Sequence, residues 1–161
     1  MNQLWKRRRP ILLAVLAALI LGISGCGGAQ ATSWTGLTVV EEILYAADLQ
    51  QIRVFDTTEE HNPLWAFPDN PEEDNRGLFY IAPTVSDEGV VIAASQTPGG
   101  GFLSQANNIV WGLDAETGKE LWSFDEARGQ YIESGAANDG IFVVGNSDGN
   151  VYALGVETGD L

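Results

Sequence analysis

The sequence predicts an all-β fold, a partial β-propeller of about three four-stranded antiparallel blades. The first observation is an internal repeat: residues 109–118 (IVWGLDAETG) return as residues 150–159 (NVYALGVETG), which places Thr117 and Thr158 41 residues apart. A period of about 40–45 residues carrying short apolar runs is typical of a propeller blade. The second observation is that Gly, Val, Ile, Thr and aromatic residues dominate the repeats and that turn signals are frequent, which favours strands over helices.

The repeat also extends upstream of the Thr-Gly turn. Residues 85–95 match residues 136–146, and in both copies a polar turn with glycine precedes an apolar strand. A third copy covers residues 38–67, and its end, Leu-Trp-Ala-Phe, matches the Leu-Trp-Ser-Phe of residues 121–124. The Asp-Gly pair within residues 146–150 predicts a tight hairpin turn between the two middle strands of a blade.

The N-terminus has the pattern of an export signal. Residues 6–9 (KRRR) are basic, residues 11–21 are uninterrupted apolar, and small residues lead to Cys26. The apolar run is shorter than the roughly 20 residues of a membrane span, which favours a signal peptide. Its end resembles the lipobox of bacterial lipoproteins, which implies cleavage before Cys26 and lipidation of its sulfur. An ordinary secretory signal with a chance cysteine is the alternative.

We therefore expect three regions in the chain. Residues 1–25 are a lipoprotein signal peptide, residues 26–36 are the lipidated cysteine and a flexible spacer, and residues 37–161 are the incomplete propeller repeats. The expected location is extracytoplasmic, with the protein held on the cell membrane or outer membrane by its acyl chains. Cys26 is the only cysteine, so an intrachain disulfide is excluded and stability depends on core packing.

The charge balance restricts the partners. The chain has 22 acidic and eight basic residues, and the signal peptide contains four of the basic ones and none of the acidic ones. A surface this acidic repels nucleic acid and anionic lipid headgroups. We therefore expect no nucleic-acid partner and contact with the membrane only through the anchor. The negative charge permits a basic protein partner or bound cations.

The turn after the repeated strand carries the most specific residues. Asp114 and Thr117 can bond turn amides, Gly118 accepts a left-handed backbone, and Trp122 begins the next strand with a large apolar face. The corresponding residues in the other copies are Thr158, Gly159 and Trp65. This pattern resembles the quinoprotein-type (PQQ-like) β-propeller repeat, whose signature is an apolar strand, Asp-x-x-Thr-Gly, and a Trp that packs between blades. Two departures are Gly155, which replaces the Asp, and residues 57–62, which lack Thr-Gly.

The resemblance implies two alternative functions. Members similar to the propeller lipoprotein of the outer-membrane β-barrel assembly machinery are not enzymes, which implies a protein-binding scaffold, here in envelope assembly. Other members are PQQ-dependent oxidoreductases, which hold the quinone in a closed eight-bladed propeller with a vicinal cysteine pair, a calcium site and a catalytic aspartate. A single cysteine argues against the second function. We expect no enzyme and no cofactor, with PQQ binding left only to a complete propeller with further C-terminal blades.

The length sets the blade number. After removal of residues 1–25, 136 residues remain. They suffice for about three blades, whereas propellers typically close with about 4–8. We expect the chain to be the N-terminal part of a 7–8-bladed propeller; assembly of several chains into one ring is the alternative.

Two segments resemble cation sites by composition. Residues 69–75 (DNPEEDN) and residues 146–150 (NSDGN) are rich in oxygen ligands. We interpret the first as a solvated acidic loop. We interpret the second as a hairpin turn, because it lacks the terminal Glu of calcium loops. We predict no metal site and no catalytic residue in the chain.

Overall fold

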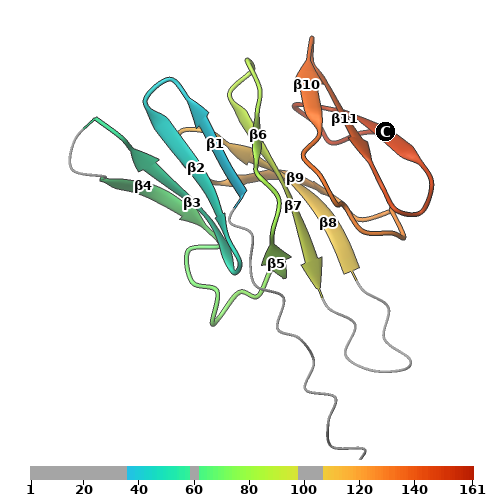
Figure 1. Ribbon diagram of the computed structural model, residues 1–161, viewed down its shortest axis with the longest axis horizontal. Helices are drawn as coiled ribbons and strands as arrows, with labels where there is room; N and C mark the ends of the chain where they lie inside the picture. The colour runs from blue at the N-terminus through green and yellow to red at the C-terminus, as the bar shows by residue number, and fades with distance from the viewer. Residues whose placement is uncertain (1–35, 59–61, 98–106) are drawn as a thin grey trace, which may run out of the picture. The chain divides into compact units, whose positions relative to one another are not determined.

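The structure, a computed structural model, describes residues 36–58, 62–97 and 107–161. The chain divides into two units, Met1–Thr32 and Ser33–Leu161, and every described residue belongs to the second. The predicted signal peptide, Cys26 and residues 27–35 of the spacer lie outside the described residues. The described part contains strands and no helix, in three antiparallel sheets that follow one another along the chain (Figure 1). The all-β class predicted from the repeats is therefore confirmed.

The first sheet is the copy predicted at residues 38–67. Its strands β1 (Gly36–Val40), β2 (Ile43–Asp48), β3 (Gln51–Asp56) and β4 (Pro63–Phe67) pair in chain order. The pairing of β3 with β4 shifts register between Val54 and Phe55. This four-stranded antiparallel meander is the expected architecture of a blade.

The second sheet contains the longest strands. Its order is β5 (Leu78–Phe79), β7 (Val90–Thr97), β8 (Asn107–Asp114) and β9 (Glu120–Phe124), and β6 (Thr84–Val85) also pairs with β7. The two short strands β5 and β6 therefore share one edge of β7 and together occupy the place of a single first strand. This blade therefore keeps the four predicted strand positions, but two short strands share the first position.

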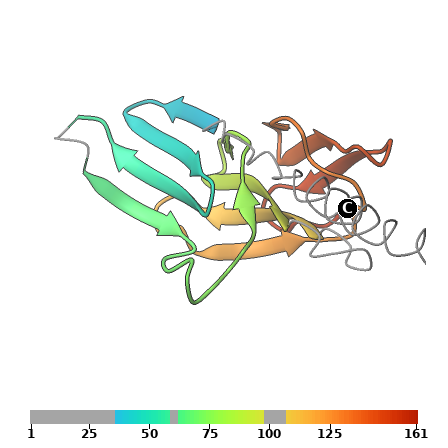
Figure 2. The same ribbon diagram turned by 60° about the horizontal axis from the view of Figure 1, so that its bottom comes forward.

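The third sheet consists of β10 (Ala136–Asn138), β11 (Ile141–Gly145) and β12 (Val151–Gly155), again in chain order. The predicted hairpin turn joins β11 to β12: the amide of Asn146 donates to the carbonyl of Asn150 at 3.0 Å. Gly149 has a φ of +92°, a left-handed conformation that glycine adopts without steric cost. Figure 2 shows the same strands after a rotation of 60°, and in both views the strands of each sheet run side by side.

The core lies between consecutive sheets, and the second sheet is buried on both faces. Along β7, Val90 and Ile92 belong to the cluster shared with the third sheet, whereas Val91 and Ala93 belong to the cluster shared with the first. Because neighbouring side chains of a strand point to opposite faces, an unbroken apolar run is what such a strand requires. The first-to-second cluster contains these buried residues: Tyr45, Ala47, Ile52, Val54, Phe67, Phe79, Val91, Ala93, Trp111 and Leu113.

The cluster between the second and third sheets has the same form. It contains Val90, Ile92, Val110, Trp122, Phe124, Ala127, Tyr131, Phe142, Val144, Leu154 and Val156. Within the described ranges, no helix is long and apolar enough to cross a membrane.

Candidate functional site

The turn between β8 and β9 has the geometry that its residue types allow. The Oδ1 atom of Asp114 accepts hydrogen bonds from the hydroxyl of Thr117 at 2.6 Å and from its amide at 2.8 Å. These donors stabilise the charged carboxylate, the hydroxyl most strongly, and they lower the pKa of Asp114 below its ordinary value of 3.8. Gly118 follows with a φ of +71°. These hydrogen bonds lie within the turn, so they stabilise its conformation independently of contacts with another blade.

Trp65 of β4 connects this turn to the preceding blade. Its indole Nε1 donates to the carbonyl of Ala115 at 2.9 Å, although the two residues are 50 positions apart. The ring also lies against Gly118, where an added Cβ would stand 2.5 Å from Cε3 of the indole. Glycine at this position therefore provides space as well as backbone freedom.

The same contacts recur one blade later. The Nε1 atom of Trp122 donates to the carbonyl of Val156 at 2.7 Å, and the ring lies against Gly159, again with 2.5 Å from an added Cβ to Cε3. Thr158 accepts a hydrogen bond from the amide of Asp160 at 3.2 Å. The loss of Asp at position 155 leaves the backbone bonds of the turn in place, because the amide of Gly159 still donates to the carbonyl of Gly155 at 2.8 Å.

The first blade also has an Asp side chain that accepts hydrogen bonds from a Thr, but a different number of residues separates the two. The amide and hydroxyl of Thr58 donate to Oδ1 of Asp56 at 2.7 and 2.6 Å. The pair is two residues apart, whereas Asp114 and Thr117 are three apart. The interactions of the Asp-x-x-Thr turn are therefore partly retained where the sequence motif is not recognisable.

A cleft of about 470 Å³ opens where the first two blades meet. One wall is the end of β4 and the connection that follows it, and the other wall is the Thr117–Gly118 turn and the start of β9. This volume lies within the range of about 300–1,000 Å³ found for ligand pockets. The cleft is lined by Ala66, Phe67, Pro68, Asp69, Asn70, Glu73, Asp74, Arg76, Thr117, Gly118, Lys119 and Glu120.

The connection that forms the acidic wall is fixed by local hydrogen bonds. The side-chain amide of Gln51 donates to the carbonyl of Pro68 at 2.7 Å and ties the start of the connection to the first blade. The side chain of Asn70 accepts from the amide of Glu72 at 3.2 Å, and that of Asn75 accepts from the amide of Gly77 at 2.9 Å. Side chains of this type are suited to bonding amides two residues ahead, so the loop has a defined shape without regular strands.

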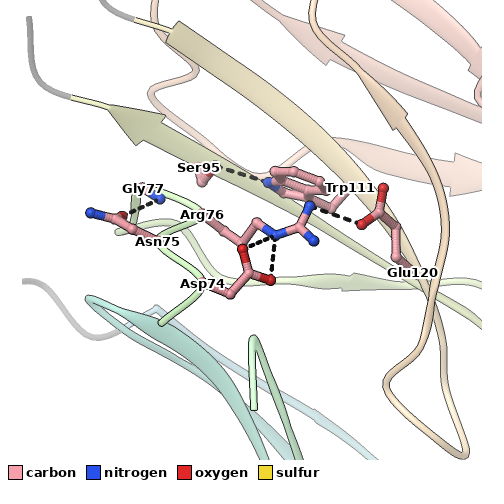
Figure 3. A network of polar contacts seen from close by, with 7 residues as sticks. All are labelled: Asp74, Asn75, Arg76, Gly77, Ser95, Trp111 and Glu120. Atoms are coloured by element: carbon pink, nitrogen blue, oxygen red, sulfur yellow. Dashed lines mark hydrogen bonds and ion pairs between the residues drawn. The ribbon is translucent and has the colours of Figure 1, made fainter. Parts of the chain in front are cut away.

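Arg76 joins the two walls of the cleft. Its Nε lies 2.8 Å from the carboxylate of Asp74 in the same loop, and its NH1 lies 3.0 Å from Oε2 of Glu120 at the start of β9. The guanidinium carbon lies 4.9 Å from the ring centroid of Trp111 and 5.6 Å from that of Phe67. Figure 3 shows the guanidinium beside the Trp111 ring, with Asp74 and Glu120 on either side of it.

The aromatic partner of Arg76 is itself anchored. The indole Nε1 of Trp111 donates to the hydroxyl of Ser95 at 2.8 Å, and both residues are buried. The same ring packs against Phe67, with 5.4 Å between centroids. The base on which the guanidinium stacks is therefore held by a hydrogen bond and by ring packing, so Arg76 is bound through both its charge and its flat face.

The ionisable residues of the cleft form no metal centre. No group of three or more His, Cys, Asp or Glu side chains is placed to hold a metal ion within residues 36–58, 62–97 and 107–161. The acidic segment 69–75 forms one wall of the cleft, and segment 146–150 is the hairpin turn described above. The arrangement thus offers carboxylates, one stacked cation and apolar side chains, which can contact a ligand through charge and through apolar packing.

The structure brings the predicted residues together in two groups. Trp65, Thr117 and Gly118 meet at the first inter-blade junction, next to Asp114, and Trp122, Thr158 and Gly159 meet at the second. Cys26 lies outside the described residues. Sequence reasoning missed Arg76 and Glu120, which are 44 residues apart. The one available signal was a single arginine directly after an acidic segment, and nothing near it in the sequence indicates its second partner.

Comparison with known proteins gives one family and a shared fold. Residues 72–161 match the family model described as outer membrane protein assembly factor BamB. A search of curated proteins finds no match. Among solved structures, BamB from Moraxella catarrhalis is similar with a TM-score of 0.54 and 18% identity, over 78% of this chain and 34% of that one.

Two solved dehydrogenases share the fold to a similar degree. A europium-containing methanol dehydrogenase has a TM-score of 0.53 and 19% identity, over 78% of this chain and 23% of its own. The quinohemoprotein alcohol dehydrogenase of Comamonas testosteroni has a TM-score of 0.55 and 18% identity, over 78% of this chain and 19% of its own. The chain therefore spans about a third or less of the length of these structures. At such identities the likeness shows a common PQQ-like propeller architecture.

Proposed function

Since the chain belongs to the family of outer membrane protein assembly factor BamB, with PQQ-like propeller repeats, we propose that it is an extracytoplasmic lipoprotein that acts as a protein-binding scaffold in envelope assembly. The family match covers the second and third blades and, from residue 72 onward, the acidic wall of the inter-blade cleft. The single observation that carries the proposal is this cleft, formed by two blades and bordered by charged side chains around an apolar floor. A surface of this kind holds a partner without any group that performs chemistry.

Tethering is part of the proposal. Cleavage before Cys26 and acylation of its sulfur place the propeller at a membrane surface, because several acyl chains anchor stably where one does not. The test is the intact mass of the protein extracted from its own membranes with detergent, compared with a Cys26→Ser variant. We expect the wild type to carry the mass of acyl chains and to remain in the membrane fraction, and the variant to lose both properties. Equal fractionation and no acyl mass on the wild type would contradict the tether.

Partner binding at the cleft is tested by crosslinking in the native cell. A photoreactive residue is placed at Lys119, which lines the cleft and is exposed, and as a control at Glu126, which is exposed and lies beyond the other end of β9. We expect irradiation to link the Lys119 variant, and not the Glu126 variant, to an envelope protein identified by mass spectrometry. Absence of adducts from Lys119, or the same adducts from both positions, would refute a scaffold that uses this cleft.

A PQQ-dependent oxidoreductase is the competing function, because the fold is shared with two dehydrogenases. It would need residues beyond those described, since the sequence contains one cysteine and the described residues offer no metal-holding group. The discriminating experiment titrates the native protein with PQQ and follows tryptophan fluorescence. The scaffold proposal predicts no saturable quenching; saturable binding together with alcohol-dependent dye reduction would favour the enzyme.

A further inference from the structure

The charges of the inter-blade cleft are unequal. Four carboxylates line it, from Asp69, Glu73, Asp74 and Glu120, against two cations, from Arg76 and Lys119. Asp69 and Glu73 are exposed on the wall formed by the connection after β4. The excess of negative charge has the same sign as the net charge of −14 for the whole chain. A positively charged ligand is therefore favoured at this place both locally and by the overall field.

The carboxylates divide into two kinds by their partners. Asp74 and Glu120 both form ion pairs with Arg76. The remaining ion pair found among the described residues joins Arg53 to Asp48, outside the cleft. Asp69 and Glu73 take part in none of the three pairs, so two carboxylates of the wall stay available to a charge from outside.

The contacts that Arg76 makes indicate which kind of cation suits the cleft. Its guanidinium lies on an aromatic face, 4.9 Å from the ring centroid of Trp111, and is bracketed by two carboxylates. Stacking on an aromatic ring and bonding to carboxylates are the two properties that distinguish arginine from a simple point charge. Half-buried Ala66 and the few accessible atoms of buried Phe67 and Pro68 add apolar contacts beside it for the methylene stem of a long basic side chain.

We propose that this cleft binds a basic segment of a partner protein, whose Arg or Lys side chains pair with Asp69 and Glu73. The inference rests on the proposed scaffold function and names the chemistry of its partner. Charge complementarity selects this occupant over an acidic one. A single bound divalent cation is the less favoured occupant, because the described residues place no three ligating side chains together.

The experiment measures peptide binding to the full chain extracted from membranes. The probe is a short fluorescein-labelled peptide in which Arg and Lys alternate with Leu, and the comparison peptide has Gln at every basic position. Fluorescence anisotropy gives the Kd at low and at physiological ionic strength. We expect saturable binding of the basic peptide, weaker binding at higher salt, and no saturation with the neutral peptide.

Two matched variants locate the binding site. Asp69→Asn combined with Glu73→Gln removes two charges from the cleft and keeps the side-chain shapes; Asp125→Asn combined with Glu126→Gln removes two exposed charges that do not line the cleft. We expect the cleft variant to bind the basic peptide about fivefold more weakly, as the loss of two exposed ion pairs implies, and the control variant to change by less than about twofold. Both variants should retain the wild-type unfolding curve, since all four side chains are exposed.

The outcomes separate this inference from the scaffold function. Equal weakening by both variants would mean that the peptide senses only the net charge, and would overturn the proposal. Equal affinity for the neutral and basic peptides would overturn it as well, and would leave the scaffold function standing if the Lys119 crosslink were still observed. Saturable calcium binding that displaces the peptide and is lost in the cleft variant would assign the carboxylates to a metal instead. Weakening confined to the cleft variant, without any Lys119 crosslink in cells, would support the site and refute its use by an envelope partner.

Discussion

The indole ring of Trp122 lies against Gly159 of the following blade, so that a Cβ atom at Gly159 would stand 2.5 Å from Cε3 of the ring. The indole N–H donates to the carbonyl of Val156 in the same turn, 2.7 Å away. Trp65 and Gly118 have the same relationship one blade earlier, with the same 2.5 Å. The Thr-Gly turn of each of these blades is therefore the surface on which the tryptophan of the preceding blade packs.

Replacing Gly159 by alanine tests this junction. The left-handed φ of +72° costs a residue with a Cβ about 1–2 kcal/mol, and the clash with Trp122 adds about 1–3 kcal/mol. We expect Gly159→Ala to lower the free energy of unfolding by about 2–5 kcal/mol in urea denaturation. Gly149→Ala is the control, because Gly149 has a φ of +92° and nothing within 4 Å of its added Cβ. Equal destabilisation of the two variants would show that backbone conformation, not the tryptophan, requires the glycine.

The buried hydrogen bond between Ser95 and Trp111 gives a second prediction. Ser95→Ala removes the acceptor of the indole N–H, which is then buried without a partner, at a cost of about 1–3 kcal/mol. Trp111→Phe removes the donor together with ring area. In a double-mutant cycle we expect a coupling of about 0.5–1.5 kcal/mol, so that the double variant loses less stability than the sum of the single ones. Strict additivity would indicate that the bond contributes nothing.

The lowered pKa of Asp114 predicts that the stability of the folded protein decreases in acid. Hydrogen bonds from Thr117 lower its pKa in the folded protein, so its contribution to stability is fully present above the ordinary value of 3.8 and is lost as the pH falls through the lower folded value. Thr117→Val removes the hydroxyl donor and should raise the pKa of Asp114 toward 3.8. Carbon-detected NMR titration of the Asp114 carboxyl measures both values. An unchanged pKa in the variant would exclude the hydroxyl as the cause.

The contacts of Arg76 predict that its replacement destabilises the protein more than the replacement of Arg53 does. Arg76→Gln loses two ion pairs and the stacking on Trp111, and we expect it to cost about 1–2 kcal/mol. Arg53→Gln loses one exposed pair, 3.5 Å from Asp48, and the contact of its guanidinium with the Phe55 ring, 5.3 Å from the centroid, and should cost less, about 0.5–1 kcal/mol. Urea denaturation at two salt concentrations measures both variants. If the two variants were equally stable, the network around Arg76 would be no stronger than an ordinary surface pair.

The propeller repeats could be recognised from the sequence because their signals are local. The Asp-Gly turn within residues 146–150 and the Asp114–Thr117 turn are each set by side chains that bond amides a few residues away, and both appear in the structure. The blade at residues 38–67 was predicted despite a degenerate turn, because its apolar strands and the Leu-Trp-Ala-Phe ending remained. The split of the first strand of the second blade into β5 and β6 was not predicted, although Pro83, directly before β6, has no backbone amide to donate to a continuous ladder.

The sequence by itself determined the blade pattern, the turn chemistry and the tryptophans that pack between blades, because these depend on residues close together along the chain. Only the tertiary structure decided which apolar faces are buried: Val90 and Ile92 in β7 are buried, whereas Ile141 and Val143 at the matching places in β11 are 52% and 41% exposed. The two runs read alike, and the difference comes from whether a described sheet packs on that face. The cleft also depends on the tertiary structure. Arg76 bonds to Glu120 only when the two blades lie next to each other, and no local sequence pattern predicts a contact between residues 44 positions apart.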